Sequence, residues 1–420
     1  MNHYASGMYF DRGGRHYNFA KYLRRAGYAP VIFCANSKHG KAERFIATDA
    51  LWEERIAEEI DTPFVFVRAR TYDGNGKQRV LNMIDFYRNV KKAAKEYAAQ
   101  HGKPDVIYAS SVHPLTLVAG IQLAKHFGVK CICEVRDLWP ESIVVYSSRF
   151  TKDNPLIKLL YRGEKWIYKK ADALVFTMEG AYDYITERGW DKDIPRSKVH
   201  YINNGVDLEQ FDYNKEHFPV DDPDLDDPDT FKVVYTGSVR RVNNLGLLLE
   251  TAKCVKDPRV KFLIWGDGDE REALEQRVRD EGISNVAFKG KVEKKYVPSI
   301  VSRADVNVMD MQKPQAKDEL LRFGNSSNKL FDYFAAGRPV VMDYQSSYNP
   351  LINYKAGIVL PEPAPERIAQ GVEVLATMLT KDYQSYCAEA RRAAEDYDFK
   401  HLAAKLAAIA EKLCADNEIS

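Results

Sequence analysis

Short apolar segments, each followed by polar or glycine residues and then by an amphipathic helix, recur in two series along this chain of 420 residues. In the first series, apolar strands are predicted at 105–109 and 131–135, and the second series starts with a strand at 231–235. A strand–turn–helix alternation predicts parallel α/β sheets, which place ligands where strands end and helices begin. The sequence therefore predicts two α/β domains in tandem, with a site in the cleft between them.

An acidic stretch separates the two series. Residues 212–230 read DYNKEHFPVDDPDLDDPDT, a segment with three prolines and no apolar periodicity. This composition is typical of a linker or a surface excursion. We therefore predict a first domain at 1–210, an acidic linker at 211–230, a second domain at 231–395 and a last helix at 396–420.

Composition limits the class of protein. Apolar content of 45% and charged content of 29% are those of a soluble globular chain. No apolar run approaches the roughly 18 residues of a membrane span, and the first residues lack the pattern of a secretory signal. The six cysteines are scattered without metal-ligand spacing, so they are interpreted as reduced thiols of a cytoplasmic protein.

The net charge of +1 conceals an asymmetry. Residues 1–210 carry 32 Lys and Arg against 25 Asp and Glu, whereas residues 211–420 carry 29 against 35. A basic first half predicts that an anionic surface or substrate meets that half. No nucleic-acid-binding motif accompanies the charge, so nucleic acid is not an expected partner.

One basic segment of the first half supports two interpretations. Residues 154–173 mix Leu, Ile, Trp and Tyr with five basic residues, which are Lys158, Arg162, Lys165, Lys169 and Lys170. A helix of this composition is typical of a peripheral contact with an anionic membrane. It is equally typical of a helix that packs on the sheet with its charges solvated. The sequence leaves both interpretations open.

The segment 325–341, NSSNKLFDYFAAGRPVV, predicts a polar loop that leads into a helix and then a strand. Ser327 and Asn328 suit the helix N-cap, and Lys329 falls in the first helical turn. Backbone N–H groups and a lysine at a helix start form an anion site suited to a phosphate. Asp332 lies one turn later, where its carboxylate can reach a ribose attached to that phosphate. The alternative is an ordinary loop–helix junction with a solvated Lys and Asp.

Residues at other strand ends are further candidates. Gly13 and Gly14 open a helix predicted at 15–26, and a glycine turn of this kind lets a diphosphate approach the backbone closely. His113 and Asp137 each follow a predicted buried strand, and both are candidate site residues. Their alternative roles are those of a helix N-terminal His and an N-cap Asp.

The first residues of the sequence look like the exit of a strand, although almost nothing precedes them. Asn2, His3 and Tyr4 lead directly toward the Gly13–Gly14 turn. We therefore expect the first strand of the first-domain sheet to be missing or very short. The start of the protein could lie upstream of this sequence.

Six motifs, in this order, resemble bacterial retaining glycosyltransferases of family 4. More narrowly, they resemble the surface-polysaccharide branch that includes fucosamine transferases. The resemblance spans nearly the whole chain and rests on Gly13-Gly14, 134–142 (EVRDLWPES), 204–207 (NGVD), 235–237 (YTG), 266–268 (GDG) and 327–333 (SNKLFDY). It implies a GT-B architecture, with two Rossmann-like domains facing each other across a cleft and C-terminal helices crossing back to the first domain.

The resemblance also implies how a nucleotide-sugar donor binds to the second domain. Two basic side chains would neutralise the donor diphosphate, and backbone N–H groups would cradle it; the residues concerned are Arg240, Ser327, Asn328, Lys329 and Leu330. Arg241 is an alternative to Arg240. Asp332 stands where the family has the second glutamate of its paired-glutamate motif, which holds the ribose, and the first glutamate would fall at Gly324.

The resemblance places His113 close to the catalytic-region histidine of the family. His113 or Asp137 would orient the acceptor or the transferred sugar. The fold usually performs its chemistry without a metal ion, so neither a metal nor another cofactor is expected.

Together these patterns predict a hexosyl- or N-acetylhexosaminyl-type glycosyltransferase. It would move a sugar from a nucleoside diphosphate, expected to be UDP, to an acceptor hydroxyl with retention of configuration. The expected acceptor is a polyprenyl-diphosphate-linked sugar in O-antigen, capsule or exopolysaccharide synthesis. The expected location is the cytoplasm, with peripheral contact at the inner face of the plasma membrane. Two alternatives share the fold: a nucleotide-sugar 2-epimerase and a non-catalytic partner subunit.

Overall fold

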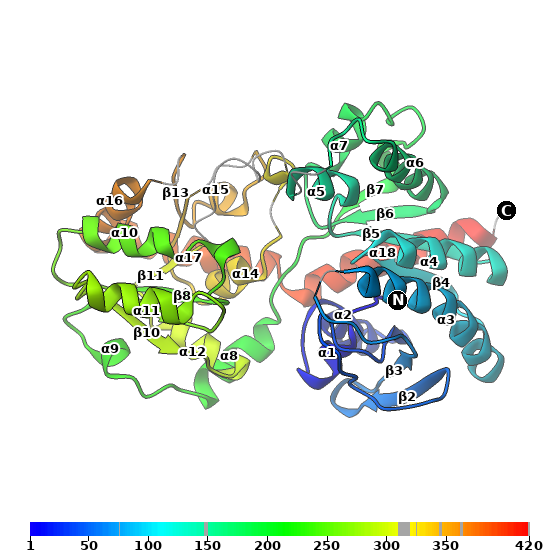
Figure 1. Cartoon of the computed structure of the whole chain (residues 1–420), viewed down its shortest axis with the longest axis horizontal. Helices are drawn as coiled ribbons and strands as arrows, with labels where there is room; N and C mark the ends of the chain where they lie inside the picture. The colour runs from blue at the N-terminus through cyan, green and yellow to red at the C-terminus, as the bar shows by residue number, and fades with distance from the viewer. Residues whose placement is uncertain are drawn as a thin grey trace. The chain divides into compact units, whose positions relative to one another are not determined.

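The computed structural model describes residues 1–74, 76–146, 150–309, 320–324, 326–343, 347–361 and 364–418. The chain divides into two compact units. Unit 1 comprises Met1–Asn203 together with Phe399–Ser420, and unit 2 comprises Asn204–Asp398. In each unit, helices flank sheets whose strands are mostly parallel (Figure 1). The predicted α/β class is therefore confirmed for both halves of the chain.

Seven strands build the described part of unit 1. Three form a sheet of order β1-β3-β2, in which β1 and β3 are parallel and β2 is antiparallel to β3. Four form a parallel sheet of order β4-β5-β6-β7. Their bounds are β1 (Ile32–Ala35), β2 (Trp52–Ala57), β3 (Thr62–Val67), β4 (Val106–Ser110), β5 (Lys130–Val135), β6 (Ala173–Phe176) and β7 (Val199–Tyr201).

The first three residues of the chain lie between these two sheets. The Asn2 N–H donates to the Phe33 carbonyl of β1 (3.0 Å), and the Ser110 N–H of β4 donates to the Met1 carbonyl (2.9 Å). These residues thus bridge β1 and β4 in the place of a central strand, without forming a named strand of their own. Because the first strand in residues 1–74 begins at Ile32, the expectation of a missing or very short first strand is confirmed.

The helices of unit 1 include one from the far end of the chain. α18 packs on α2, where the Phe19 and Phe399 rings meet edge to face at 5.5 Å. The predicted return of the last helix to the first domain is therefore confirmed. The helices are α1 (Ser6–Phe10), α2 (Arg15–Arg25), α3 (Lys77–His101), α4 (Pro114–Phe127), α5 (Trp139–Tyr146), α6 (Pro155–Lys170), α7 (Ala181–Glu187) and α18 (Phe399–Glu418), with short 3₁₀ turns η1 (Glu58–Ile60) and η2 (Arg196–Lys198).

The described part of unit 2 contains one parallel sheet of order β10-β9-β8-β11-β12-β13. Its strands are β8 (Phe231–Thr236), β9 (Val260–Trp265), β10 (Val286–Gly290), β11 (Val306–Val308), β12 (Val340–Met342) and β13 (Gly357–Val359). Its helices are α8 (Leu208–His217), α9 (Pro223–Asp226), α10 (Gly246–Cys254), α11 (Arg271–Asp280), α12 (Val297–Ser302), α14 (Asn328–Ala335), α15 (Pro350–Tyr354), α16 (Pro365–Ala376) and α17 (Thr380–Asp396), with 3₁₀ turns η3 (Arg241–Asn243) and η4 (Lys294–Tyr296).

The segment 211–230, predicted from composition as an acidic linker, lies inside unit 2 and contains most of α8 and all of α9. Its acidic residues have local partners. The Asp222 carboxylate caps α9 by accepting the Leu225 N–H (3.2 Å), and it pairs with Lys289 (2.8 Å). Leu225 is buried against the sheet. Composition alone does not reveal the pair with Lys289, because these residues are 67 positions apart and only the fold brings them together.

Candidate functional site

The helix at the centre of the predicted donor site forms as expected. α14 begins at Asn328, with Ser327 at the N-cap position in extended conformation. Leu330, Phe331 and Phe334 are completely buried, so they anchor the helix on the core. Ser327 makes no side-chain capping bond, and the Leu330 N–H donates to the Ser327 carbonyl (3.3 Å). The first residue of the predicted segment, Asn325, lies outside the described residues.

Two hydrogen bonds to other parts of unit 2 fix this helix start. The Asn204 amide donates to the Ser326 carbonyl (2.6 Å), which holds the chain just ahead of α14. The Tyr333 hydroxyl, one turn into the helix, accepts the Thr236 N–H at the end of β8 (3.2 Å). The N-terminus of α14 is therefore tied to the carboxyl end of the central strand.

Lys329 reaches across to that same strand end. Its ammonium group donates to the Tyr235 hydroxyl (3.1 Å) and lies 4.5 Å from the centre of the Tyr235 ring. A Cβ placed on Gly237 would lie 3.0 Å from the Lys329 Nζ. A cation from the first turn of α14 thus stands beside the glycine turn that follows β8, where a parallel sheet places its ligands.

The glycines after β8 and β9 allow two turns to pack backbone against backbone. A Cβ on Gly266 would lie 1.7 Å from the Gly237 carbonyl oxygen, and one on Gly268 would lie 2.2 Å from the Val239 carbonyl oxygen. The Val239 N–H donates to the Asp267 carbonyl (3.0 Å), which locks the two turns together. The GDG motif therefore serves close packing of the strand-end turns, because no other residue type fits there.

Asp332 and Arg240 complete the predicted donor-side set. Asp332 is half-buried one turn after Lys329, and burial raises its pKa to about 6 against an opposing influence of Lys294. Arg240 and Arg241 are both exposed and follow the Gly237 turn. The structure thus places Lys329 beside the Gly237 turn at the carboxyl end of β8, with Asp332 one helical turn further along α14 and exposed arginines close by in the chain.

In unit 1 the Gly13–Gly14 turn opens α2, as predicted. Gly14 occupies the N-cap position with φ +104°, a conformation that strongly favours glycine. The next residue, Arg15, is almost completely buried. Its guanidinium donates to the carbonyl groups of Ile202 (2.8 Å) and Asn203 (2.6 Å), the last residues before the chain enters unit 2.

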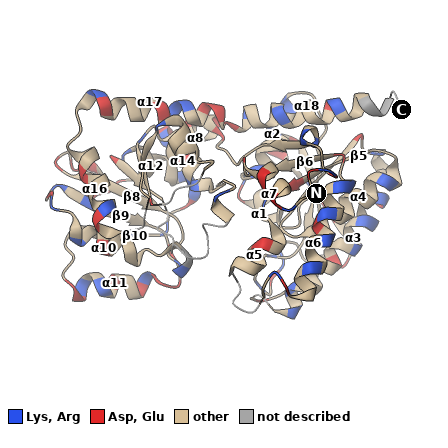
Figure 2. Ribbon diagram, turned by 90° about the horizontal axis from the view of Figure 1, so that it is seen from above, with Lys and Arg blue, Asp and Glu red and all other residues tan. Residues whose placement is uncertain are grey.

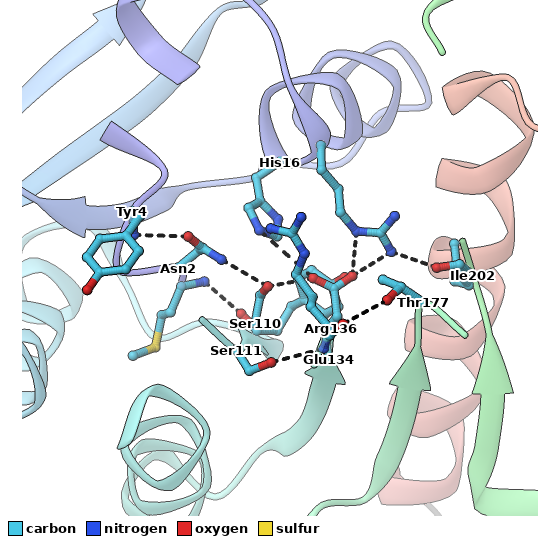
Figure 3. Close-up of polar contacts among 12 residues, drawn as sticks. Asn2, Tyr4, His16, Ser110, Ser111, Glu134, Arg136, Thr177 and Ile202 are labelled. Carbon is cyan, nitrogen blue, oxygen red and sulfur yellow. Dashed lines mark hydrogen bonds and ion pairs between the residues drawn. The ribbon is translucent and has the colours of Figure 1, made fainter. Parts of the chain in front are cut away.

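The partner of Arg15 is Glu134, the first residue of the motif 134–142, which the sequence analysis did not predict as a site residue. Its carboxylate at the end of β5 is completely buried and accepts bonds from Arg15 Nε (2.6 Å), the Ser110 hydroxyl (2.5 Å) and the Tyr108 hydroxyl. Figure 3 shows Ser110 and Glu134 pointing toward one another. The Asn2 side chain lies between Ser110 and Tyr4 and is hydrogen-bonded to both. Burial, the largest single influence, would raise the pKa of Glu134, but Arg15, His16 and Arg136 together outweigh it and lower the pKa to about 2. A charged residue in the apolar strand CICEV was the available signal.

His113 and Asp137, the candidate catalytic residues, have different environments. His113 occupies the N-cap position of α4 without a side-chain capping bond, and it is completely buried, with its Nε2 2.6 Å from Nδ1 of His3. Burial, assisted by the charge of Arg79, lowers the pKa of His113 to about 3, so the ring is neutral. Asp137 is exposed, and partial loss of water raises the pKa of its carboxyl while Arg136 opposes the change. No hydrogen bond joins these two described side chains.

The chain has the GT-B fold. This fold consists of two α/β units with largely parallel sheets, and here the last helix packs on unit 1. The family assignments agree with this class. Residues 15–210 match the family profile "Glycosyltransferase Family 4", and residues 230–378 match "Glycosyl transferases group 1". Both halves of the chain thus match glycosyltransferase families.

Individual proteins and structures support the same fold. Sucrose-phosphate synthase of Thermosynechococcus elongatus is similar with a TM-score of 0.68 and 19% identity, covering 96% of this chain and 94% of that one. Anabaena HepE in complex with UDP gives a TM-score of 0.64 and 13% identity over 98% of both chains. TuaH of Bacillus subtilis (strain 168), named as a teichuronic acid biosynthesis glycosyltransferase, is 26% identical over 216 residues. That alignment covers 50% of this chain and 49% of TuaH, so the chain spans about half the length of this relative.

Proposed function

We propose that the protein transfers a sugar from a nucleoside diphosphate to an acceptor hydroxyl, with retention of the anomeric configuration. The observation that carries the proposal is the position of Lys329, a cation in the first turn of α14 that stands beside the Gly237 turn after β8. Solved neighbours with this fold hold UDP or UDP-glucose, which supports a nucleotide-sugar donor here and UDP as the first nucleotide to test.

The hard step of such a transfer is the departure of the nucleoside diphosphate from an electron-poor sugar carbon. Negative charge grows on the leaving oxygen as the bond breaks. Lys329, the first N–H groups of α14 and the exposed Arg240 would stabilise that charge from fixed positions. These groups would perform the task without a metal ion.

Asp332 would hold the nucleoside. With its pKa raised to about 6, the carboxyl is mostly ionised at pH 7 and accepts hydrogen bonds from two ribose hydroxyls. These bonds would form in the bound donor and persist in the transition state. They would therefore contribute to donor affinity more than to turnover.

Unit 1 would bind the acceptor. The Gly13–Gly14 turn would approach the donor diphosphate, and Asp137 or His113 would orient the acceptor or the transferred sugar. Of these two, Asp137 is the one that a substrate can reach without rearrangement, because it is exposed whereas His113 is completely buried. Asp137 is therefore the better candidate for direct contact.

The enzyme would act in surface-polysaccharide synthesis. Its acceptor would be a polyprenyl-diphosphate-linked sugar, and the transferred group would be a hexosyl or N-acetylhexosaminyl group. The likeness to a protein named for teichuronic acid biosynthesis supports this pathway class. A lipid-linked acceptor would keep the enzyme at the inner face of the plasma membrane. Within the described residues, no helix is long and apolar enough to cross a membrane.

The experiment is a panel of nucleotide sugars incubated with membrane extract that contains polyprenyl-linked acceptors. We expect one donor to label a lipid-linked product, with the anomeric configuration of the donor sugar retained in the new linkage. Conversion of a nucleotide sugar to its 2-epimer without any acceptor would instead identify an epimerase. Donor binding with no product from any combination would identify a non-catalytic subunit.

A further inference from the structure

Helix α6 has two apolar faces, and the core covers only one of them. Ile157 and Ile167 are buried in unit 1. In contrast, Leu156, Leu159 and Trp166 expose 51%, 60% and 41% of their surface. Packing on the sheet therefore accounts for one face of the helix and leaves three large apolar side chains in contact with solvent. Clustered exposure of this kind usually marks an interaction surface.

The exposed apolar residues fall on one line along the helix. Leu156, Leu159, Gly163 and Trp166 are spaced at i, i+3, i+7 and i+10, which places them on a single face. Gly163 has no side chain, and a Cβ built there would meet nothing within 4 Å. We call this line the α6 stripe.

Basic residues border the α6 stripe. Four of them follow one another at i, i+4, i+7 and i+11, and a fifth ends the helix; they are Lys158, Arg162, Lys165, Lys169 and Lys170. Two carboxylates oppose them. Asp193 accepts both Lys165 (2.6 Å) and Lys169 (2.7 Å), and Asp153 pairs with Lys158 (3.1 Å). Among the described residues, five basic groups thus meet two acidic partners, so positive charge remains beside the stripe. Figure 2 shows Lys and Arg positions along α6.

We propose that the α6 stripe docks on an anionic membrane surface. The apolar side chains enter the headgroup boundary, while the neighbouring lysines and arginine lie at the level of the lipid phosphates. The charge excess selects an anionic lipid surface over a neutral one. The two sequence interpretations of this helix are therefore compatible, because one face packs on the sheet and the other meets lipid. The purpose of docking, access to a lipid-linked acceptor, rests on the proposed function; the binding itself does not.

The test is co-sedimentation of the full chain with vesicles of phosphatidylcholine, with and without phosphatidylglycerol. We expect binding only when phosphatidylglycerol is present, and release at high salt. Replacing Lys158, Arg162, Lys165 and Lys169 by Gln lowers the vesicle affinity by about 5-fold for each charge removed. Leu156→Ser with Leu159→Ser lowers it by about 10-fold per residue, without any change in charge.

A matched control removes the same charge from another helix of unit 1. Lys77, Arg88, Lys92 and Lys95 are exposed on α3, and their replacement by Gln leaves vesicle binding close to wild type if the α6 stripe is the docking face. Thermal melting confirms folding, and UDP titration measures donor binding separately. Equal vesicle binding by wild type and both α6 variants overturns the proposal while leaving the proposed function standing. Conversion of a dimer to a monomer by the Leu→Ser variant, with vesicle binding retained, assigns the stripe to a second copy of the chain instead.

Discussion

Arg15 and Glu134 form a buried ion pair, with Nε and Nη2 of the guanidinium 2.6 and 2.5 Å from the same carboxylate oxygen. Their side chains expose 2% and 0% of their surface. Arg15 also holds the carbonyl groups of Ile202 and Asn203, where the chain leaves unit 1. The pair therefore connects the Gly14 turn, the end of β5 and the crossing to unit 2.

Removing one partner of this pair should be strongly destabilising. In Glu134→Ala, the buried Arg15 keeps its charge without a carboxylate, and the free energy of unfolding should fall by about 3–5 kcal/mol. The double change Arg15→Met with Glu134→Leu removes both charges and should be less destabilising than Glu134→Ala. Chemical denaturation of the three proteins measures these differences. Equal stability of Glu134→Ala and wild type would show that the pair contributes nothing.

The Glu134 carboxylate should dominate the loss of unfolding free energy of unit 1 at acidic pH. Its pKa is lowered to about 2 in the folded chain, whereas an unfolded glutamate titrates near 4.3. A lowered pKa stabilises the fold above the unfolded value, and this contribution is lost as the pH falls toward 2. Between about pH 4.5 and 2.5, wild type should therefore lose more unfolding free energy than Glu134→Gln. Parallel pH profiles for the two proteins would contradict the assignment.

Two glycines should respond in opposite directions to the same substitution. Gly266→Ala places a Cβ 1.7 Å from the Gly237 carbonyl oxygen, so the two strand-end turns must separate. We expect a loss of about 2 kcal/mol or more in stability, together with weaker donor binding. Gly163→Ala on α6 meets no atom within 4 Å and should stabilise the helix by about 0.5–1 kcal/mol. Denaturation curves and UDP titration of both variants provide the comparison.

Donor binding should depend on the protonation of Asp332. Its pKa is raised to about 6, so acidification below that value protonates the carboxyl and removes an acceptor for the ribose hydroxyls. Donor affinity should therefore fall as the pH drops from about 7 to 5. Asp332→Asn should bind donor more weakly at pH 7 and lack this pH dependence. If wild type and Asp332→Asn follow the same pH curve, the carboxyl does not contact the donor.

The sequence predicted the α/β class and the main strand–helix alternation because these depend on local periodicity. It missed β2, whose residues Glu53, Glu54 and Arg55 break the apolar–polar alternation expected of a strand. That strand is held by antiparallel pairing with β3, in which Trp52 lies opposite Val67. The acidic segment 211–230 was predicted as a linker for a related reason, since the lysines and arginine that pair with its aspartates lie far away in the sequence.

The part of the site that comes from one continuous segment, the start of α14, was predictable from the sequence. The pattern around Lys329 indicated a helix start with a cation, and α14 begins one residue before it. The contact of Lys329 with Tyr235 joins residues that are 94 positions apart, and the pairing of His3 with His113 joins residues 110 apart. Only the folded sheet brings such groups together, so no local pattern could indicate them or the burial of His113.

The role of Lys329 at the donor site is measured by the turnover number of Lys329→Ala with the donor and acceptor that the nucleotide-sugar panel identifies. The ammonium group stands at the strand-end turn where leaving-group charge would develop, so its loss should reduce turnover about 100-fold or more. Arg392→Ala, a change at an exposed residue on α17, serves as the control and should leave turnover unchanged, with thermal melting used to confirm that both variants fold. Wild-type turnover and wild-type donor affinity in Lys329→Ala would contradict the account, because the start of α14 would then be a structural junction rather than the donor site.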